Sequence, residues 1–488
     1  MATTVEEPEQ LNKKLNYGIA IVLGSGGFYF GYYVACFNPF EKPILEGELG
    51  YVLGTDSEKT MIGLVNMLFA VGAMVGVLFT GALADRFGRR PLLIFGEVLA
   101  LLCVIPYSIA NIYSLLFARF ISGAVAGVNS SIFSIMMAEM LPNSVCGFGN
   151  GFSYFALTLA ILISYLTQNI FNYDQMVQNW RLLLLWPAII SLLRLILFPI
   201  YIRTDTPKYL YNSAPNSQAG ELAVRRAYGL IYSQRSVDAV ASESIALYEK
   251  QKTAGTVSVG TLFGPQYRKR LFSGCYVAFG QQVSGINFLI FYSTTLFNEL
   301  QDGLGKTMTL VVGICNFTGS IIVIYLISRL GRKFNLVMGP LFQSIAFFIL
   351  YIGYIQKTIW ILIVSVCLYI ISFAIGLGGT ETAYIGEILP PAGVGLALAV
   401  QWIMTALIGQ FLPALISIFG SSTLIIFFAF ACLFFFFTFD YFLIETKGKS
   451  EQQIITEFES GHYRFLSFLC PKKDNAVDYD QLHGQNSN

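Results

Sequence analysis

The stretch EMLPNSVCG (residues 139–147) has a near copy in the second half of the chain, EILPPAGVG (residues 387–395). Both follow the pattern E-x-L-P-x-x-x-x-G, and both come after a long apolar run. A second pair, DRFGRR (85–90) and SRLGRK (328–333), lies at nearly the same offset and again follows an apolar run in each half. Two matched pairs at nearly one offset predict that the chain contains two copies of one structural unit.

Apolar runs of about 20 residues, the length that crosses the roughly 30 Å hydrocarbon core of a bilayer as a helix, fill most of both units. Of the 488 residues, 55% are hydrophobic and only 12% are charged, which is the balance of a polytopic helical membrane protein. We therefore predict twelve transmembrane helices, at residues 16–38, 60–83, 91–111, 113–138, 148–170, 182–202, 270–299, 307–327, 334–355, 358–384, 394–418 and 421–443.

These helices divide the chain into five parts. We predict an N-terminal tail (1–15), a six-helix bundle (16–202), a polar segment of short cytoplasmic linker helices (203–269), a second six-helix bundle (270–443) and a C-terminal tail (444–488). Parallel repeats of six helices place two bundles around a cavity at the bilayer midplane, a plan typical of transporters. The predicted fold class is an all-α polytopic membrane protein made of two six-helix bundles.

The placement of lysine and arginine predicts the orientation of the chain. Most of the 30 Lys and Arg residues lie in the tails, in the linker and in the loops after helices 2 and 8. The loops on the opposite side carry Lys42, Lys59, Arg181, Lys306 and Lys357. Both termini are therefore expected in the cytosol of a plasma-membrane protein. The alternative is an internal membrane such as the mitochondrial inner membrane, with both termini in the matrix.

Several function classes are disfavoured by the residues present. The eight cysteines form no C-x-x-C pair, and both histidines, His462 and His483, lie in the C-terminal tail. Neither a metal site nor an imidazole base is therefore expected within the membrane. The glycine-rich GSGG (24–27) lies in an apolar helix and does not follow a strand, so it is not a nucleotide-binding loop. We expect no enzyme activity, no cofactor and no nucleic-acid partner.

The run QQVSGINFLIFY (281–292) places several amides in the seventh apolar segment. Carboxamides in hydrocarbon are costly unless their hydrogen bonds are satisfied. One explanation is adhesion between helices. The other is a site for a polyhydroxylated solute, because an amide, like a hydroxyl, both donates and accepts. On a regular helix Gln282 and Asn287 would point about 140° apart, so both face one ligand only if the helix breaks at Ser284–Gly285.

With these motifs in view, the chain resembles the sugar porter family of the major facilitator superfamily over about residues 16–450. The resemblance rests on GALADRFGRR after helix 2, ARFISG in helix 4, E-x-x-P after helix 4, TDTPKYL after helix 6, QQVSGIN in helix 7 and ETKGKS after helix 12. It implies transport of a hexose or related small polar solute by alternating access, in which two bundles rock around a central site. Such proteins are facilitators or proton-linked symporters.

The resemblance also implies roles for individual residues. Substrate contact is implied for a set of cavity positions: Gln281, Gln282, Asn287, Asn316, Glu381, Thr382 and Tyr154. Phe291 and Tyr292 are implied to form an outer gate or a stacking surface, with ordinary apolar packing as the alternative. Charges at the cytoplasmic ends imply an ion-pair latch built from Asp85, Arg86, Arg89, Arg90, Glu139, Arg332 and Glu387. The expected pairs in this latch are Arg90–Glu139 and Arg332–Glu387.

The chain departs from the family at several of these places. Tyr33 stands where proton-linked members carry an aspartate, which favours facilitative transport. Cys146 and Val394 replace both arginines of the latch, and a weaker latch should favour the inward-open state. Helix 10 reads FAIGLGGTETAY (373–384) in place of a family run that contains a glutamate, prolines and a tryptophan, and Glu381 is an intramembrane carboxylate acquired at a new position. Glu381 has three interpretations: it binds substrate, it carries a coupling proton, or it pairs with another residue in the bundle.

The sequence therefore supports two hypotheses for the function of this protein, from different classes. The first is a carrier, more facilitative than proton-coupled, whose partners are a hexose-like solute and the lipid bilayer. The second is a degenerate carrier that serves as a structural subunit of a larger membrane complex or as a sensor. The altered latch and the rebuilt helix 10 motivate this second function, and it would bring other membrane proteins as partners.

Overall fold

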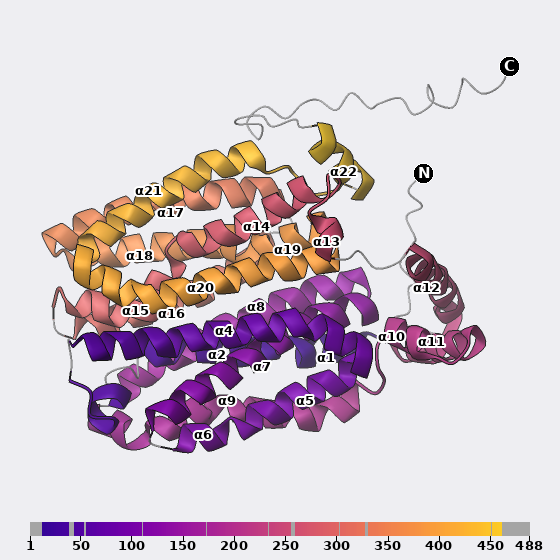
Figure 1. Ribbon diagram of the computed structural model, residues 1–488, viewed down its shortest axis with the longest axis horizontal. Helices are drawn as coiled ribbons and strands as arrows, with labels where there is room; N and C mark the ends of the chain where they lie inside the picture. Colours follow the sequence, from indigo (N-terminus) through magenta and orange to yellow (C-terminus); the bar gives the residue numbers. More distant parts are fainter. Residues whose placement is uncertain are drawn as a thin grey trace.

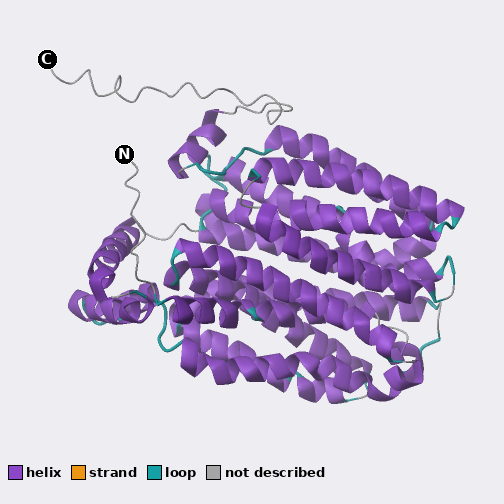
Figure 2. Ribbon diagram, turned by 180° about the vertical axis from the view of Figure 1, so that it is seen from behind, coloured by secondary structure: helices purple, strands orange, loops and turns teal. Residues whose placement is uncertain are grey.

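The computed structural model describes residues 12–38, 43–52, 55–109, 111–171, 173–232, 234–254, 259–301, 303–326, 330–449 and 451–460. Most of the two predicted tails, and Ser328 in the second arginine motif, lie outside these ranges. Within them the chain folds into helices joined by short loops, without a β-strand (Figure 2).

The first half of the described chain forms six membrane-length segments, which occupy the lower part of Figure 1. Two of them are interrupted: α1 (Lys13–Gly24) continues as α2 (Gly26–Ala35), and α5 (Arg89–Leu102) continues as α6 (Val104–Ser108). The continuous ones are α4 (Asp56–Phe87), α7 (Ile112–Met140), α8 (Asn143–Ile170) and α9 (Tyr173–Tyr201). A short π-helix, η1 (Pro43–Glu48), lies between α2 and α4.

The second half repeats this plan in the upper part of Figure 1. Its interrupted segments are α14 (Arg268–Val283) with α15 (Ile286–Asn298), and α18 (Ile359–Phe373) with the π-helix η2 (Ala374–Gly378) and α19 (Gly379–Ile388). Its continuous helices are α16 (Leu304–Leu326), α17 (Arg332–Gln356), α20 (Pro391–Phe419) and α21 (Ser421–Phe442). The described residues therefore form the predicted all-α fold of two six-helix bundles.

The E-x-L-P motif ends one membrane helix and starts the next in each half. Leu141 and Leu389 adopt extended backbone, with ψ of 149° and 145°, because the ring of the following proline disfavours the helical region. α7 and α19 therefore end just before these leucines, and α8 and α20 begin directly after Pro142 and Pro390. One proline effect thus produces the same boundary in both repeats.

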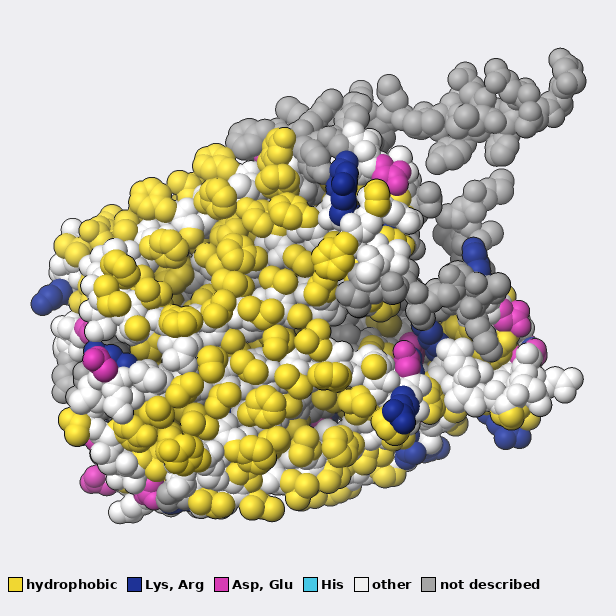
Figure 3. Space-filling model, in the orientation of Figure 1, with side chains coloured by type: hydrophobic (Ala, Val, Ile, Leu, Met, Phe, Trp, Pro, Cys, Tyr) yellow, Lys and Arg dark blue, Asp and Glu magenta, His cyan; other side chains and the backbone are white. Residues whose placement is uncertain are grey.

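The surface and the helix contacts are those of a protein in lipid. Large apolar side chains cover the outside of both bundles (Figure 3), and ten described segments are long and apolar enough to cross a membrane. Helices approach closely where residues are small, since a Cβ at Gly123 of α7 would overlap the Phe69 carbonyl of α4. Small residues at such contacts are typical of membrane helix packing.

The polar helices gather at one end of the bundles, which we call the linker end (Figure 1). The linker helices there are α10 (Pro207–Ser213), α11 (Ser217–Ile231), α12 (Gln234–Ala254) and α13 (Val259–Leu262). The last described helix, α22 (Glu451–Ser460), lies at the same end. Asn16 Nδ2 donates to the Ile231 carbonyl over 3.0 Å, and Lys269 Nζ donates to the Phe458 carbonyl over 3.1 Å. We call the opposite end, where η1 lies, the far end.

Candidate functional site

The seventh membrane segment breaks at the dipeptide where the sequence predicts it. α14 ends at Val283 and α15 begins at Ile286, and Gly285 between them has φ +94°. A Cβ at Gly285 would lie 2.8 Å from the Phe347 ring, so glycine is required both by the backbone and by the available space. The break turns the chain so that Asn287 Nδ2 donates to Gln282 Oε1 over 2.6 Å.

Side chains of α14, α15 and α20 form a largely buried amide network, which consists of Gln281, Gln282, Asn287, Gln401 and Thr405. Gln281 Oε1 accepts from Gln282 Nε2 and from Gln401 Nε2, both over 2.6 Å. Gln282 Oε1 accepts from Asn287 and from Thr405 Oγ1, the latter over 2.9 Å. The side-chain oxygens of Gln281 and Gln282 therefore each accept two hydrogen bonds.

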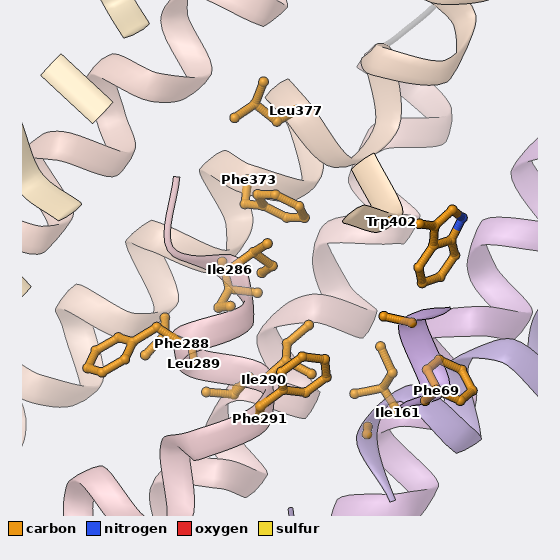
Figure 4. Close-up of a cluster of buried hydrophobic side chains, with 14 of the residues drawn as sticks. Phe69, Ile161, Ile286, Phe288, Leu289, Ile290, Phe291, Phe373, Leu377 and Trp402 are labelled. Carbon is orange, nitrogen blue, oxygen red and sulfur yellow. The ribbon is translucent and has the colours of Figure 1, made fainter. Parts of the chain in front are cut away.

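Gln401 and Thr405 were not predicted as site residues. They are four residues apart on α20, so they share one face of the helix. The available signal was this pair of polar residues inside the apolar run 394–418. Trp402, next to Gln401, is buried against the other bundle, with its ring centroid 6.4 Å from that of Phe69 (Figure 4). α20 therefore carries part of the amide network and part of the contact between bundles.

Glu381 of α19 lies beside the amide network and is 1% exposed. Its carboxyl group lies close enough to interact with the Gln281 side chain, and Gln281 Nε2 donates to the Leu377 carbonyl over 3.3 Å. Within the described part of the chain, Glu381 Oε1 has no hydrogen-bond partner. The structure thus places a buried carboxylate against the amides of α14.

The other predicted substrate residues differ in their placement. Asn316 of α16 is buried, and its Oδ1 has no hydrogen-bond partner among the described residues. The Tyr154 hydroxyl of α8 would lie 2.9 Å from a Cβ at Gly378, so this residue contacts η2 from the opposite bundle. Thr382 is exposed. The structure therefore brings Gln281, Gln282, Asn287 and Glu381 together, while a substrate contact by any of the seven stays a prediction.

The predicted aromatic pair lies at a contact between the bundles. Tyr292 of α15 donates its hydroxyl to the Gly409 carbonyl of α20 over 2.7 Å and accepts from Asn66 Nδ2 of α4 over 3.3 Å. Phe291 is buried and packs edge-on against Tyr292, with ring centroids 6.3 Å apart, in the apolar cluster of Figure 4. This position fits a gate, and the gating role stays a prediction.

Further hydrogen bonds between the bundles gather toward the far end. Asn38 Nδ2 of the N-terminal bundle donates to Ser293 Oγ over 2.9 Å and to the Ile290 carbonyl over 2.8 Å. The Tyr165 hydroxyl donates to the same carbonyl over 2.9 Å. These bonds hold the two bundles together at the far end.

At the linker end, ion pairs form within each bundle. Arg89 Nε and Nη2 donate to the two carboxylate oxygens of Glu139, each over 3.0 Å, and Arg89 Nη2 lies 2.8 Å from Asp85 Oδ1. Arg332 Nε and Nη2 donate to Glu387 Oε1 over 3.1 and 2.9 Å. The expected Arg332–Glu387 pair is therefore present, and its counterpart in the first bundle uses Arg89.

The expected Arg90–Glu139 pair is wrong. Arg90 Nε donates to the Ile202 carbonyl over 2.8 Å, and Arg89 takes the place at Glu139. Successive residues of a helix point about 100° apart, so only one of the two arginines can face α7. Arg86 is exposed in the last turn of α4 and lies over the ring of its neighbour Phe87, which puts Arg86 outside this ion pair.

A carboxylate from the linker holds the start of α5. Asp205 Oδ1 accepts from the Arg89 backbone N–H over 3.1 Å, and Oδ2 accepts from that of Arg90 over 3.2 Å. A carboxylate here satisfies N–H groups that have no partner inside the helix. Burial nevertheless raises the pKa of Asp205, although these N–H donors oppose the shift. A Cβ at Gly88 would overlap this carboxylate, which explains the glycine of DRFGRR.

The second bundle repeats this arrangement. Glu445 Oε1 accepts from the Arg332 backbone N–H over 2.8 Å, and Oε2 accepts from that of Lys333 over 3.1 Å. A Cβ at Gly331 would overlap the Glu445 carboxylate. TDTPKYL and ETKGKS thus supply equivalent acceptors, although the sequence did not indicate their partners.

Two arginines are buried within the N-terminal bundle. Arg119 Nη1 donates to the Tyr33 carbonyl over 2.6 Å, and its Nε donates to the Val65 carbonyl over 3.1 Å. Arg194 forms a buried ion pair with Glu97. The charge of Arg119 therefore meets backbone oxygens of α2 and α4.

Comparisons with known proteins agree with this architecture. The sugar (and other) transporter family model matches residues 19–458. The glucose transporter GlcP of Staphylococcus epidermidis is 27% identical over 457 residues, covering 90% of this chain and 97% of that protein. Facilitated glucose transporter protein 1 of Caenorhabditis elegans is 28% identical over 481 residues, covering 90% of each. The arabinose-proton symporter of Bacillus subtilis is 27% identical over 457 residues, covering 89% of this chain and 93% of that protein.

Solved structures show the same fold. The major facilitator superfamily proton:xylose symporter XylE bound to 6-bromo-6-deoxy-D-glucose superposes with a TM-score of 0.75 at 20% identity, covering 92% of this chain and 100% of that one. The inward open conformation of XylE from E. coli gives a TM-score of 0.73 at 21% identity, covering 91% and 99%. These proteins are transporters and not enzymes, and the predicted fold is confirmed. The chain belongs to the sugar (and other) transporter family.

Proposed function

We propose that this sugar transporter of the major facilitator superfamily moves a hexose or a related small polar solute by facilitated diffusion. The amide network is the observation that carries the proposal. Its members lie near the middle of α14–α15 and α20. Polar groups at this depth in a membrane are costly, and they are found where they pair with one another or serve a function. Amides offer donors and acceptors without charge, which suits sugar hydroxyls.

The arrangement of contacts supports alternating access. Hydrogen bonds such as Asn38–Ser293 and Tyr292–Asn66 join the bundles toward the far end, whereas the Arg89–Glu139 and Arg332–Glu387 pairs lie within single bundles at the linker end. We assign the linker end to the cytosolic side of a plasma membrane, because most lysines and arginines lie there. In that orientation the molecule is in an inward-facing form, as the weakened latch favours.

The facilitative mode rests on Tyr33 and Arg119. The relatives include both a facilitated glucose transporter and an arabinose-proton symporter, so similarity alone does not select a mode. In this chain Arg119 binds the backbone carbonyls of Tyr33 and Val65. Helix 1 therefore offers Arg119 no carboxylate that a transported proton would neutralise.

Uptake by purified protein in liposomes tests the proposed site. Gln282→Ala and Asn287→Ala each remove a member of the amide network, and we expect each to lower sugar uptake roughly tenfold or more, since a lost hydrogen bond costs about 1–2 kcal/mol. Gln343→Ala is the matched control, because Gln343 is a buried amide of α17 outside the network. Wild-type uptake in both site variants would contradict the site.

A retained structural subunit or a sensor is the second candidate. The observation that favours it is Tyr154, whose hydroxyl contacts η2 between the bundles and so occupies space that a substrate needs. If this function is correct, the purified protein shows no sugar flux and copurifies in fixed ratio with other membrane proteins. Flux from the isolated protein would exclude it.

A further inference from the structure

Two of the predicted substrate residues carry a buried acceptor without a partner among the described residues. Glu381 Oε1 and Asn316 Oδ1 are both buried acceptors, and neither has a partner in the described structure. Asn316 belongs to α16, which packs against η2, and Glu381 belongs to α19, which follows η2 directly. Buried polar atoms normally find partners, so these two acceptors point to a ligand that donates.

The side-chain oxygens of Gln281 and Gln282 leave no comparable capacity. Gln281 Oε1 and Gln282 Oε1 each accept two hydrogen bonds from within the network. A donor on the substrate therefore finds its unfilled acceptors at Glu381 and Asn316. Of these two, only Glu381 can carry a negative charge.

Three cationic side chains of α14 and α17 are engaged elsewhere. Lys333 of α17 donates to the Asp440 carbonyl over 2.7 Å, and Arg332 pairs with Glu387. Arg270 of α14 donates to the Ile388 carbonyl over 2.6 Å. Among the described residues, no ion pair joins any of them to Glu381. A buried carboxylate without a cation is strongly unfavourable, so this site is completed either by a proton on Glu381 or by a cation from outside the chain.

We propose that Glu381 binds a protonated amine of the substrate, so that the preferred solute is an amino sugar or a similar amine-bearing polyol. An ammonium group has three donors and one positive charge, which matches a carboxylate and a neighbouring amide oxygen. The amide network offers its N–H donors to the oxygens of the hydroxyl groups. This inference rests on the proposed function and names the substrate class of the same site.

The test compares a neutral sugar with its amine. Radiolabelled glucose and glucosamine are offered to liposomes that contain the purified protein, with and without an inside-negative potassium diffusion potential. We expect glucosamine uptake to exceed glucose uptake about tenfold, and the potential to accelerate only glucosamine, because only that solute carries charge inward. Glu381→Gln should lower the ratio of glucosamine to glucose uptake at least tenfold, whereas Glu381→Asp should keep most of it.

Two controls make the result decisive. Glu299→Gln removes a carboxylate at the far end, where Glu299 binds Tyr354 and Ser421, and should leave the uptake ratio as in the wild type. Size-exclusion profiles in detergent verify that each variant is folded.

Each other outcome overturns the inference in a recognisable way. Equal uptake of both sugars with an unaltered ratio in Glu381→Gln overturns it and leaves the proposed function standing. Glucose uptake that a proton gradient drives in the wild type but not in Glu381→Gln assigns Glu381 to a proton instead. Absence of flux for both sugars overturns the proposed function itself.

Discussion

At the scale of single residues, Arg194 shows how this chain places charge inside the membrane. Its guanidinium pairs with Glu97 of α5, and its Nε donates to the Val22 carbonyl over 3.2 Å. A Cβ at Gly26 would lie 3.0 Å from the same guanidinium. Arg194 of α9 therefore ties α5 to the interruption between α1 and α2, where backbone carbonyls are free to accept.

The Glu97–Arg194 pair makes a stability prediction. Glu97→Leu leaves the arginine buried without its partner, which costs about 3–5 kcal/mol, and we expect a large drop in the thermal unfolding midpoint in detergent. The double variant Glu97→Leu/Arg194→Leu removes both charges and should recover most of that loss. A double variant as unstable as the single one would show that the pair itself, and not the stranded charge, provides the stability.

At the scale of elements, the break between α14 and α15 sets the geometry of the site. Gly285 takes a positive φ, and the turn allows Asn287 and Gln282 to meet although they are five residues apart. The rings of Phe347 and Phe428 close over the turn at 2.8 and 3.0 Å from a Cβ built there. The amide network therefore depends on the absence of a side chain at one position.

Gly285→Ala tests this dependence. The added methyl group meets both backbone strain and the two rings, and overpacking of this kind costs about 1–3 kcal/mol. We expect a lower thermal unfolding midpoint together with reduced sugar uptake. Gly420→Ala is the matched control, because Gly420 also has a positive φ, of 79°, but a Cβ there would meet nothing within 4 Å. Equal effects of the two substitutions would mean that backbone strain alone, without crowding by the rings, accounts for the loss.

At the scale of the whole molecule, the two ends differ in what holds them. Contacts between bundles such as Asn38–Ser293 lie at the far end, and the arginine–glutamate pairs of the linker end stay within bundles. Alternating access requires the far-end contacts to open in each cycle. A covalent bond across them should therefore stop transport.

Asn38→Cys/Ser293→Cys tests this requirement, because Asn38 Nδ2 and Ser293 Oγ lie 2.9 Å apart across the contact, and the loss of free thiol verifies that the disulfide has formed. We expect oxidation to abolish uptake in liposomes and a reductant to restore it. The two single-cysteine variants, which keep the natural cysteines such as Cys36, should be insensitive to the oxidant. Full uptake after complete cross-linking would contradict rocking of the bundles about the site.

How much of the structure could be predicted from the sequence depends on how far apart along the chain the interacting residues are. Some features act only on neighbouring residues: the length of each apolar run, the proline that ends α7 and α19, and the glycine at the break of α14–α15. The repeat and the fold class depend on these features, so both were predictable. Arg89, and not Arg90, reaches Glu139 because of how α5 is rotated about its axis. Gln401 and Thr405 join the amides of α14–α15 because α20 turns that face toward them.

The amino-acid order thus settles what is local: twelve apolar segments, two repeats, and amides at a helix break. Packing between helices settles which polar groups meet, because a partner distant in the chain depends on the tilt and rotation of each helix. Asp205 and Glu445 become caps of α5 and α17 in this way. Glu381 likewise becomes a buried carboxylate beside Gln281 only after α19 and α14 pack, since no spacing along the chain specifies that contact.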